Sequence, residues 1–471
     1  MGRKGNLVKN MAILSLGTVV PKIASFITLP IITACLTKTE YGTYDLITVL
    51  VSLVLPVVTL QMQGAAFRFL ISTRGDGREQ KIVVTNISSF IVGVSACALA
   101  VLYVCFREID NPIRICIIVY LGVDICLTTA RQIARGLAKN MAYSVSALVN
   151  ALIEMILVAV LLKGYHKGLT GLMCALIFSQ LLSLVYLVVS ARILSYIDFS
   201  LISAEKIKEF LSYSWPLVPN SLSSWVIRVS DRFIISLFLG IEANAIYAVA
   251  NKLPNIFSIA QSTFTLSWQE NASVAAADKD SAEYYGEVFS DIYNLFIGMM
   301  ALLIASTPII FKILIRGDYE EAYNHMVILY FGVLFSSISS YLGGIYIANM
   351  KTRQIGITTL IAAGINFIIN ILLVKRIGIY AATLSTVVSY LWLVLYRMID
   401  IQKIQKIRFH YIRIILLLLI IVVMALLCFS RVWLLDLVNA GIGAITFTAL
   451  NWKMLAGIFV SLKNRRKLQK N

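Results

Sequence analysis

Long apolar runs are the feature that most limits how this chain can fold. Runs of 18 or more mostly apolar residues recur from one end of the 471-residue sequence to the other. A helix of about 20 apolar residues crosses the ~30 Å hydrocarbon core of a membrane. Only 14% of the residues are charged, whereas soluble domains contain about 25%. The sequence therefore predicts an all-α, polytopic membrane protein and excludes a soluble globular fold.

The number of spans follows from the apolar runs and the polar breaks between them. We expect about fourteen transmembrane helices, at roughly residues 10–36, 41–71, 82–106, 113–137, 141–162, 168–197, 211–239, 244–271, 284–313, 324–350, 353–375, 377–399, 409–429 and 436–462. We divide them into an N-lobe (spans 1–6), a C-lobe (spans 7–12), and spans 13–14 with a basic cytoplasmic tail, at residues 1–200, 201–400 and 401–471.

A weak internal repeat supports the division into two lobes. Residues 239–247 can be aligned with residues 36–44, which places Tyr247 on Tyr44. Each copy ends a long helix, turns, and begins the next helix. Two six-helix lobes related by a parallel repeat would explain the match, as in other transporters, and a chance match is the alternative. Between the lobes, residues 203–210 are polar and predict a surface helix.

The distribution of lysine and arginine sets the expected orientation. With the N-terminus inside, about 25 of these residues fall in inner segments, Arg397 among them, and about 10 fall in outer segments. This asymmetry predicts that both termini are cytoplasmic. The net charge of +17 does not indicate a nucleic-acid partner, because the basic residues lie between apolar spans. The seven cysteines and three histidines show neither metal-ligand nor catalytic spacing, so we expect no catalytic residue, metal or cofactor.

Five cations inside or at the ends of the predicted spans are the candidate substrate-binding residues. A charge at the centre of a membrane costs about 2.5–3.5 kcal/mol, so we expect these side chains to face a bundle interior or a wet cavity. A cationic cavity suits an anionic cargo. The five residues are Lys22, Arg68, Arg228, Arg232 and Lys252.

The local sequence around the cations leaves some alternatives open. Arg228, Asp231 and Arg232 share one helix face at i, i+3 and i+4, and a structural ion pair between the lobes is the alternative to substrate binding. Lys22 follows Pro21 in the first span, where snorkelling to the interface is the alternative. Arg68 lies near the inner end of its span, where it could instead reach lipid headgroups.

Acidic and aromatic residues inside the spans form a second candidate set. Asp124 precedes Arg131 by two helical turns, and Glu154 follows Asn150 at i+4. These acids either bind a coupling cation or form structural pairs, and structural pairing is favoured. The set of acids is Asp45, Asp124, Glu154 and Asp231. The tryptophans either line a sugar path or anchor the protein at the membrane interface, and anchoring is favoured for Trp215 and Trp268.

Four stretches of the sequence resemble a known family. They are residues 29–45 together with Arg68, residues 230–252, residues 267–272 and residues 378–386. In this order and spacing they resemble bacterial polysaccharide transporters, the O-antigen and capsule flippases of the multidrug/oligosaccharidyl-lipid/polysaccharide (MOP) superfamily. The resemblance implies two six-helix lobes that form a V, with two additional C-terminal helices, and cavity cations on spans 1, 2, 7 and 8.

The resemblance also implies a function. Such proteins move oligosaccharides linked to undecaprenyl pyrophosphate from the inner to the outer leaflet of the bacterial plasma membrane by alternating access, for capsule, O-antigen or exopolysaccharide synthesis. We therefore expect a flippase that is not an enzyme, with lipid-linked oligosaccharide and membrane lipids as its partners. A polysaccharide polymerase is a further candidate partner, and we expect a monomer. Coupling to Na⁺, H⁺ or the membrane potential stays open. A lipid II-type flippase and a cation-coupled multidrug antiporter are the alternatives.

Overall fold

The computed structural model describes residues 21–73, 75–276, 278 and 280–468. The described residues are 87% helical, and they form no strand. Among them, eleven helices are long and apolar enough to cross a membrane, and two shorter apolar helices accompany these. The all-α, polytopic prediction is confirmed. Each of the fourteen predicted spans coincides with helical structure, and the part of the first span before Pro21 lies outside the described residues.

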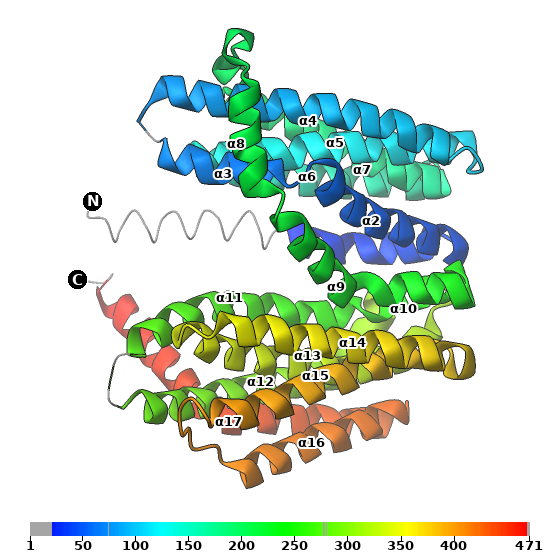
Figure 1. The fold of residues 1–471 in the computed structure, drawn as a ribbon. Coiled ribbons are helices and arrows are strands. Elements are labelled where there is room, and N and C mark those ends of the chain that lie inside the picture. Colours follow the sequence, from blue (N-terminus) through cyan, green and yellow to red (C-terminus); the bar gives the residue numbers. More distant parts are fainter. Residues whose placement is uncertain (1–20, 74, 277, 279, 469–471) are drawn as a thin grey trace. The chain divides into compact units, whose positions relative to one another are not determined.

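The helices are labelled in Figure 1. The first half of the chain contains a helix at Pro21–Cys35, followed by α2 (Lys38–Val58), α3 (Met62–Ser72), α4 (Gly77–Cys105), α5 (Asn111–Gly136), α6 (Asn140–Val158) with the π-helical turn η1 (Ala159–Gly164), α7 (Gly168–Ser190), the short 3₁₀ turns η2 (Ile193–Tyr196) and η3 (Phe199–Leu201), α8 (Ala204–Ser214) and α9 (Leu217–Leu239). The second half contains α10 (Ile241–Ala250), α11 (Lys252–Ala275), α12 (Ser281–Leu314), α13 (Glu320–Ala348), α14 (Thr352–Ile377), α15 (Tyr380–Ile401), α16 (Tyr411–Phe429) and α17 (Trp433–Leu468).

The chain divides into two compact units. The N-unit contains the described residues up to Phe233 together with Leu314–Asp318, and the C-unit contains Ile234–Ile313 and the described residues from Tyr319 onward. The division falls inside α9, so this helix contributes to both units. The lobe limits expected from the sequence, and the V arrangement, stay predictions. The predicted surface helix exists as α8, whose start is capped by the Ser203 side chain accepting from the Lys206 amide.

Two of the interrupted spans contain a proline close to the interruption. The span at residues 41–71 ends as α2 and resumes as α3, because Leu60 and Gln61 adopt left-handed backbone angles (φ 46° and 58°). Pro56 precedes this break, and a proline cannot donate the helical hydrogen bond to the carbonyl four residues earlier. The span at residues 244–271 divides after Ala250, the residue whose carbonyl Pro254 leaves without its helical donor.

The predicted repeat is visible in how each unit packs. In the N-unit, α5 packs against α3 and α7, and α6 packs against α7. In the C-unit, α13 packs in the same way against α11 and α15, and α14 packs against α15. The central helices of the two units therefore share one packing arrangement, as a parallel repeat requires.

The turns between the central helices repeat as well. Ala138 follows α5 with φ 59°, and Met350 follows α13 with φ 58°. In the first turn the Lys139 amide donates to the Ala134 carbonyl at 2.8 Å. In the second turn the Lys351 amide donates to the Tyr346 carbonyl, also at 2.8 Å. The repeat thus extends to single hydrogen bonds.

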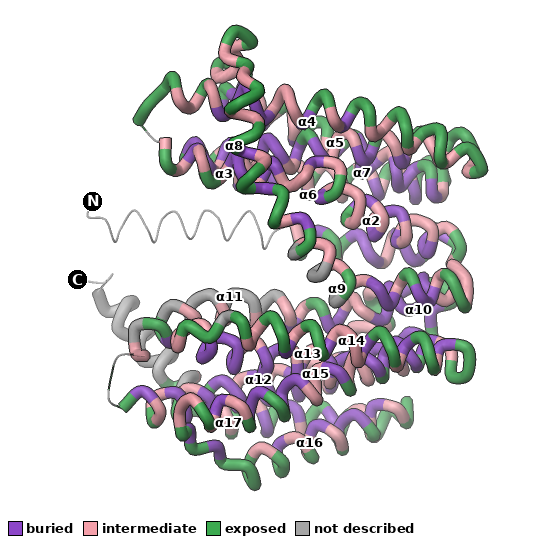
Figure 2. Tube along the Cα trace, in the orientation of Figure 1, coloured by how far each residue is buried: buried purple, intermediate pink, exposed green. Residues whose placement is uncertain are grey.

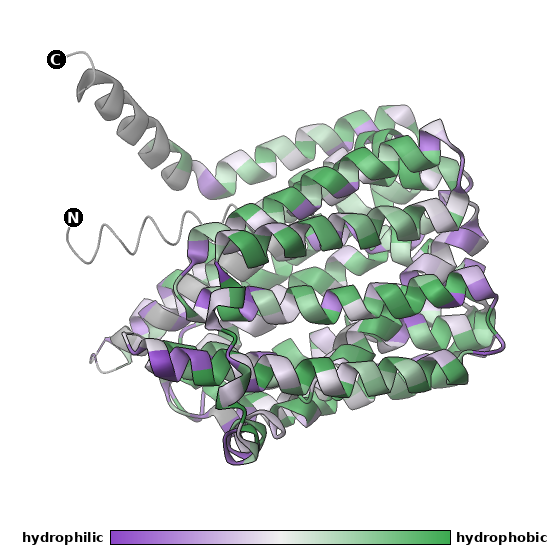
Figure 3. Cartoon of the chain, turned by 90° about the horizontal axis from the view of Figure 1, so that it is seen from above, coloured by the Kyte–Doolittle hydropathy of each residue, from purple (hydrophilic) through white to green (hydrophobic). Residues whose placement is uncertain are grey.

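The distribution of polarity fits helices surrounded by lipid. Helix α13 is buried along most of its length, whereas α4 and α16 expose apolar side chains such as Val104 and Ile412 (Figure 2). Hydrophobic residues cover the middles of the helices, and hydrophilic residues gather toward their ends (Figure 3). An exposed apolar surface of this extent is stable in hydrocarbon and costly in water. The molecule is a multi-pass membrane protein.

Candidate functional site

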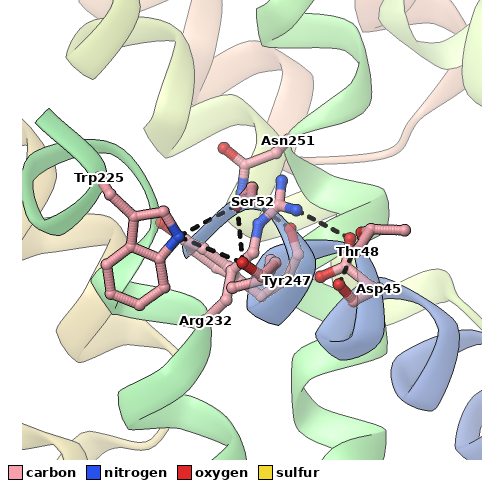
Figure 4. Close-up of polar contacts among 8 residues, drawn as sticks. Asp45, Thr48, Ser52, Trp225, Arg232, Tyr247 and Asn251 are labelled. Carbon is pink, nitrogen blue, oxygen red and sulfur yellow. Dashed lines mark hydrogen bonds and ion pairs between the residues drawn. The ribbon is translucent and has the colours of Figure 1, made fainter. Parts of the chain in front are cut away.

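Helix α9 lies along the broken span in the N-unit. Gln61, in the break itself, donates from Nε2 to Ser221 Oγ at 2.8 Å. One helical turn further along α9, Trp225 Nε1 donates to the Val49 carbonyl at 3.2 Å and to Ser52 Oγ at 3.1 Å (Figure 4). Polar side chains therefore hold one face of α9 against α2 and α3. Trp225 contributes two of these hydrogen bonds.

An ion pair continues the same contact. Arg232 Nη1 lies 2.8 Å from Asp45 Oδ1 (Figure 4). The Asp45 side chain is only 6% exposed and that of Arg232 is 23% exposed. A charge pair with so little access to water is costly to separate, because each partner would keep its desolvation cost without the compensating attraction. Asp231, the residue before Arg232 on α9, is also buried.

The start of α2 places Asp45. Thr37 caps the helix by accepting from the Glu40 amide, and the Glu40 carboxylate accepts from the Thr37 amide in return. This reciprocal cap fixes where the first turn begins. Glu40 also accepts from the Leu169 amide at 3.1 Å, which joins the first turns of α2 and α7. Asp45 then follows about two turns along a helix whose start is fixed at two points.

The other predicted cations lie in several places. Lys22 is exposed on the helix Pro21–Cys35, and Arg68 is exposed on α3. Lys252 is half-buried and begins α11 in the C-unit. The side chain of Arg228 lies outside the described residues. Arg232 thus has an acidic neighbour from another helix, and a single cationic cavity formed by all five residues stays a prediction.

Two of the predicted acids lie inside the N-unit. Asp124 of α5 accepts from Gln180 Nε2 of α7 at 3.3 Å. Arg131, two turns along α5, is close enough to act electrostatically on Asp124. Glu154 of α6 acts in the same way on Tyr44 and on Tyr120, which belongs to α5. Polar groups from four helices therefore meet in the interior of this unit.

A small cavity lies beside Glu154. Its volume is about 30 Å³, enough for about two water molecules. The first helix contributes Ser25 and Thr28, and α6 contributes Asn150 and Glu154. Both hydroxyls donate to backbone carbonyls, which leaves their oxygen lone pairs available. The buried Asn150 Oδ1 has no hydrogen-bond partner among the described residues. Oxygen atoms of this kind are ligands that can hold a hard cation, a proton or a water molecule.

One buried cation was missed by the sequence analysis. Arg397 was expected in an inner segment, but it is 4% exposed inside the C-unit, on α15. Its guanidinium donates to the Ser339 carbonyl at 2.8 Å and to the hydroxyls of Thr358 and Thr359 at 3.1 and 2.9 Å. Its position inside the predicted span at residues 377–399 is the signal that could have revealed it.

The expected interface anchor at Trp268 was also wrong. This side chain is buried in the C-unit, where Nε1 donates to the Tyr341 carbonyl at 2.8 Å and the ring stacks on Tyr341 with centroids 4.4 Å apart. Trp215, in contrast, is exposed. Among the described residues, no group of three or more histidine, cysteine or acidic side chains could hold a metal ion.

Sequence comparisons give a family match. The family model described as "Polysaccharide biosynthesis protein" matches residues 7–269, more than half of the chain. The chain is also 30% identical over 203 residues to an "Uncharacterized membrane protein MJ1068" of Methanocaldococcus jannaschii. That alignment covers 40% of this chain and 38% of the archaeal protein.

Comparisons with solved structures show a shared fold. A structure of the lipid II flippase MurJ in an inward closed conformation has a TM-score of 0.68 and 14% identity, and the match covers 95% of this chain and 99% of that one. An inward-facing MATE family multidrug transporter of the MOP superfamily has a TM-score of 0.66 and 11% identity, and the match covers 83% and 98%. A MOP superfamily transporter from Pyrococcus furiosus, described as having a binding pocket of reverse polarity, has a TM-score of 0.54 and 10% identity, with 84% and 95% covered.

Proposed function

The chain belongs to the polysaccharide biosynthesis protein family, and from this premise we propose that it is a flippase for oligosaccharides linked to undecaprenyl pyrophosphate. The family and the fold are those of membrane transporters. The proposed cargo is a repeat unit of a surface polysaccharide such as capsule, O-antigen or exopolysaccharide. The chain moves the unit from the inner to the outer leaflet of the bacterial plasma membrane, with both of its termini in the cytoplasm, and leaves the cargo chemically unchanged.

The charge distribution supports an anionic cargo. Lys22, Arg68, Arg228, Arg232 and Lys252 are the proposed cationic lining, and a lining of this sign replaces water around a pyrophosphate. An inside-negative potential favours outward movement of an anion by about 2.3 kcal/mol per charge per 100 mV. The emptied, positively charged site is then favoured to return inward by the same field. The prenyl chain stays in the lipid while the sugars cross, and the units alternate access to the two sides.

The small cavity beside Glu154 is the proposed site of ion coupling. It offers a carboxylate, an amide oxygen without a hydrogen-bond partner among the described residues, and two hydroxyl oxygens. Na⁺ or H⁺ would be held by Glu154, with Asp124 as a second acid in the same unit. Asp45 is assigned a structural role, because it pairs with Arg232. Asp231 is assigned the same structural role, since it lies next to Arg232 on α9. No other cofactor is proposed.

Two alternatives share the fold. A lipid II-type flippase is favoured by the 95% coverage of this chain in the MurJ match. The MATE match favours a cation-coupled multidrug antiporter. The positive charges of the proposed lining oppose this alternative, because cationic drugs require an acidic pocket. A polysaccharide polymerase is the proposed protein partner, and the chain is proposed to act as a monomer.

The test is a flipping assay in proteoliposomes that contain a fluorescent lipid-linked oligosaccharide or lipid II. The variants are Arg228→Gln, Arg232→Gln and Lys252→Gln, with Lys208→Gln on the exposed surface of α8 as the matched control. We expect each cavity variant to slow flipping of the oligosaccharide about tenfold or more, since one charge-assisted hydrogen bond is worth about 1.5–3 kcal/mol. Flipping at the wild-type rate in all three variants would contradict the proposal. Faster flipping of lipid II by the wild type would favour the alternative cargo.

The Asp45→Asn variant distinguishes a cargo-binding role of Arg232 from a purely structural one. If Arg232 binds the cargo, Asp45→Asn preserves the cation and flipping persists, whereas Arg232→Gln abolishes it. If Arg232 only holds the helices together, both substitutions reduce flipping to the same extent. Glu154→Gln tests the coupling site in the same vesicles: dependence of the rate on a Na⁺ or proton gradient is expected to disappear. A gradient dependence equal to that of the wild type would remove Glu154 from the mechanism.

A further inference from the structure

A second, larger pocket lies at one end of the N-unit, away from the ion pair and the acid-lined cavity. Its volume is about 490 Å³. The first turns of α4 line one side, and the segment that follows α7, residues 191–203 (here the connector), lines the other. The polar lining consists of Arg78, Gln80, Lys81, Ser195, Tyr196 and Asp198.

The connector is held in a defined shape by two side chains of α4. Asn86 donates to the Leu201 carbonyl at 2.9 Å and accepts from the Ser203 amide at 2.7 Å. Thr85 Oγ1 accepts from the Asp198 amide at 2.9 Å. Thr85 and Asn86 are both fully buried, so these hydrogen bonds are shielded from competing water. The pocket therefore has fixed walls on both sides, and its polar groups keep their spacing.

The charges in the pocket have both signs. Arg78 and Lys81 supply two positive charges from one turn of α4. Asp198 supplies a carboxylate, and hydrogen bonds from the Ser200 hydroxyl and amide hold the pKa of Asp198 below its ordinary value. Asp198 is thus charged at neutral pH. The first free amides of α4 are already occupied by Asp76, which accepts from the amides of Arg78 and Glu79, so the side chains provide the anion-binding capacity.

The surroundings of the pocket are apolar and exposed. Leu194 and Phe199, both in the connector, are 67% and 73% exposed. The apolar helix α4 begins here and the apolar helix α7 ends here, which places the pocket at a boundary between membrane and water. Large apolar side chains beside basic residues at such a boundary are typical of segments that insert into the headgroup region. A lipid therefore fits this place better than a soluble molecule does.

We propose that this pocket binds the headgroup of a membrane phospholipid that carries both a phosphate and a primary amine, the phosphoethanolamine class. The phosphate contacts Arg78 and Lys81, the ammonium group contacts Asp198, and the hydroxyls of Tyr196 and Ser195 offer further hydrogen bonds. The lipid chains lie along the exposed apolar residues of the connector. A choline headgroup fits less well, because its quaternary ammonium has no N–H to donate to Asp198.

The test measures lipid binding to the purified full chain in detergent. Dioctanoyl phosphatidylethanolamine, phosphatidylcholine and phosphatidylglycerol are titrated separately, as is glycerophosphoethanolamine, which has the headgroup without chains. Retention is read by native mass spectrometry and by the shift of the thermal unfolding midpoint. We expect phosphatidylethanolamine to bind about tenfold more tightly than the other two lipids. We expect glycerophosphoethanolamine to bind more weakly than the intact lipid.

Two variants give different signatures. Arg78→Gln/Lys81→Gln is expected to weaken binding of all three lipids at least tenfold, because it removes the phosphate contacts. Asp198→Asn is expected to retain binding and lose the preference for ethanolamine over choline. Lys208→Gln, an exposed substitution on α8, is the matched control and is expected to bind as the wild type does.

Three outcomes would overturn the proposal. The first is equal affinity of the wild type for the three lipids. The second is a preference for ethanolamine that survives Asp198→Asn. The third is glycerophosphoethanolamine binding as tightly as the intact lipid, which would identify the ligand as a soluble phosphate compound. Because Asp198→Asn changes selectivity while retaining binding, its result does not depend on the double variant remaining folded.

Discussion

Asp318 Oδ2 lies 2.7 Å from Lys38 Nζ, although the two residues are 280 positions apart in the chain. Asp318 belongs to residues 314–318, which connect α12 to α13 of the C-unit but pack with the N-unit. A second contact supports the first, since the Arg316 amide donates to the buried Thr33 Oγ1 at 2.9 Å. The 314–318 segment is therefore held by the N-unit while both of its ends continue into the C-unit.

A covalent tether at this contact is expected to stop transport. In Lys38→Cys/Asp318→Cys, a short bis-thiol reagent would fix the 314–318 segment to the start of α2. The native ion pair is exposed and worth at most about 1 kcal/mol, so it opens readily, whereas a covalent bond does not. If the units move relative to each other during the proposed cycle, flipping in proteoliposomes should fall to background and return after reduction.

The single variants Lys38→Cys and Asp318→Cys, treated with the same reagent, control for the native cysteines, some of which are exposed. Both should flip at the wild-type rate. A tethered protein that retains full activity would mean that the 314–318 segment does not move with the C-unit during transport.

The Asp45–Arg232 pair is expected to contribute to stability as a coupled unit. Removing either charge leaves the other in a site with little water, so Asp45→Asn and Arg232→Gln should each lower the free energy of unfolding by about 2–3 kcal/mol. The double variant should cost less than the sum of the single variants. Unfolding in mixed detergent, analysed as a double-mutant cycle, measures a coupling expected at about 1–3 kcal/mol. Strictly additive effects would show that the pair contributes nothing beyond its two separate residues.

Arg397 is expected to be essential for the stability of the C-unit, and lysine is expected to replace it only in part. Arg397→Ala removes the hydrogen bonds to Ser339, Thr358 and Thr359. It should lower the free energy of unfolding by about 3–5 kcal/mol, since each hydrogen bond to a charged group contributes about 1.5–3 kcal/mol. Arg397→Lys keeps the charge but has no planar fork that reaches Ser339, Thr358 and Thr359 together, so it should recover less than half of that loss. Arg376→Ala, at an exposed position on α14, is the control. A fully stable Arg397→Lys protein would show that charge alone matters at this position.

The two left-handed turns are expected to respond alike to glycine. Ala138→Gly and Met350→Gly should each raise the free energy of unfolding by about 0.5–1 kcal/mol, because glycine adopts positive φ without the steric cost that other residues meet. Met350 is 86% exposed, so the substitution removes little packing. Ala444→Gly, in the exposed middle of α17, should have the opposite sign at about 1 kcal/mol. Thermal unfolding of the three variants in one detergent compares them directly.

The helices could be predicted from the sequence because hydrocarbon imposes a simple requirement. A span must be apolar over its whole length and must satisfy its backbone internally, and both conditions are visible in local composition. The breaks at residues 59–61 and after Ala250 were harder, because the apolar runs continue through them. Pro56 and Pro254 mark both places, but a proline also occurs in unbroken transmembrane helices when neighbours compensate.

The partners of the charged residues could not be predicted in the same way. Arg232 and Asp45 are 187 positions apart, whereas helical periodicity brings together only residues three or four positions apart. Arg397 satisfies its donors with neutral oxygens from α13 and α14, and neutral acceptors leave no charge pattern in the sequence. Trp268 was assigned to the interface from its residue type, whereas its packing depends on Tyr341, which lies far along the chain.

The matched turns at Ala138 and Met350 have a consequence for ancestry. Neither residue favours a left-handed backbone, and duplication and fusion of a gene for six helices accounts for the same geometry in both places. Counted from these turns, Glu154 and Asn366 occupy equivalent positions, each sixteen residues on. Asn366 donates to Ser385 and Thr386. After the duplication one copy thus carries a carboxylate and the other an amide at this position, so that only one half of the descendant can lose or gain a proton there.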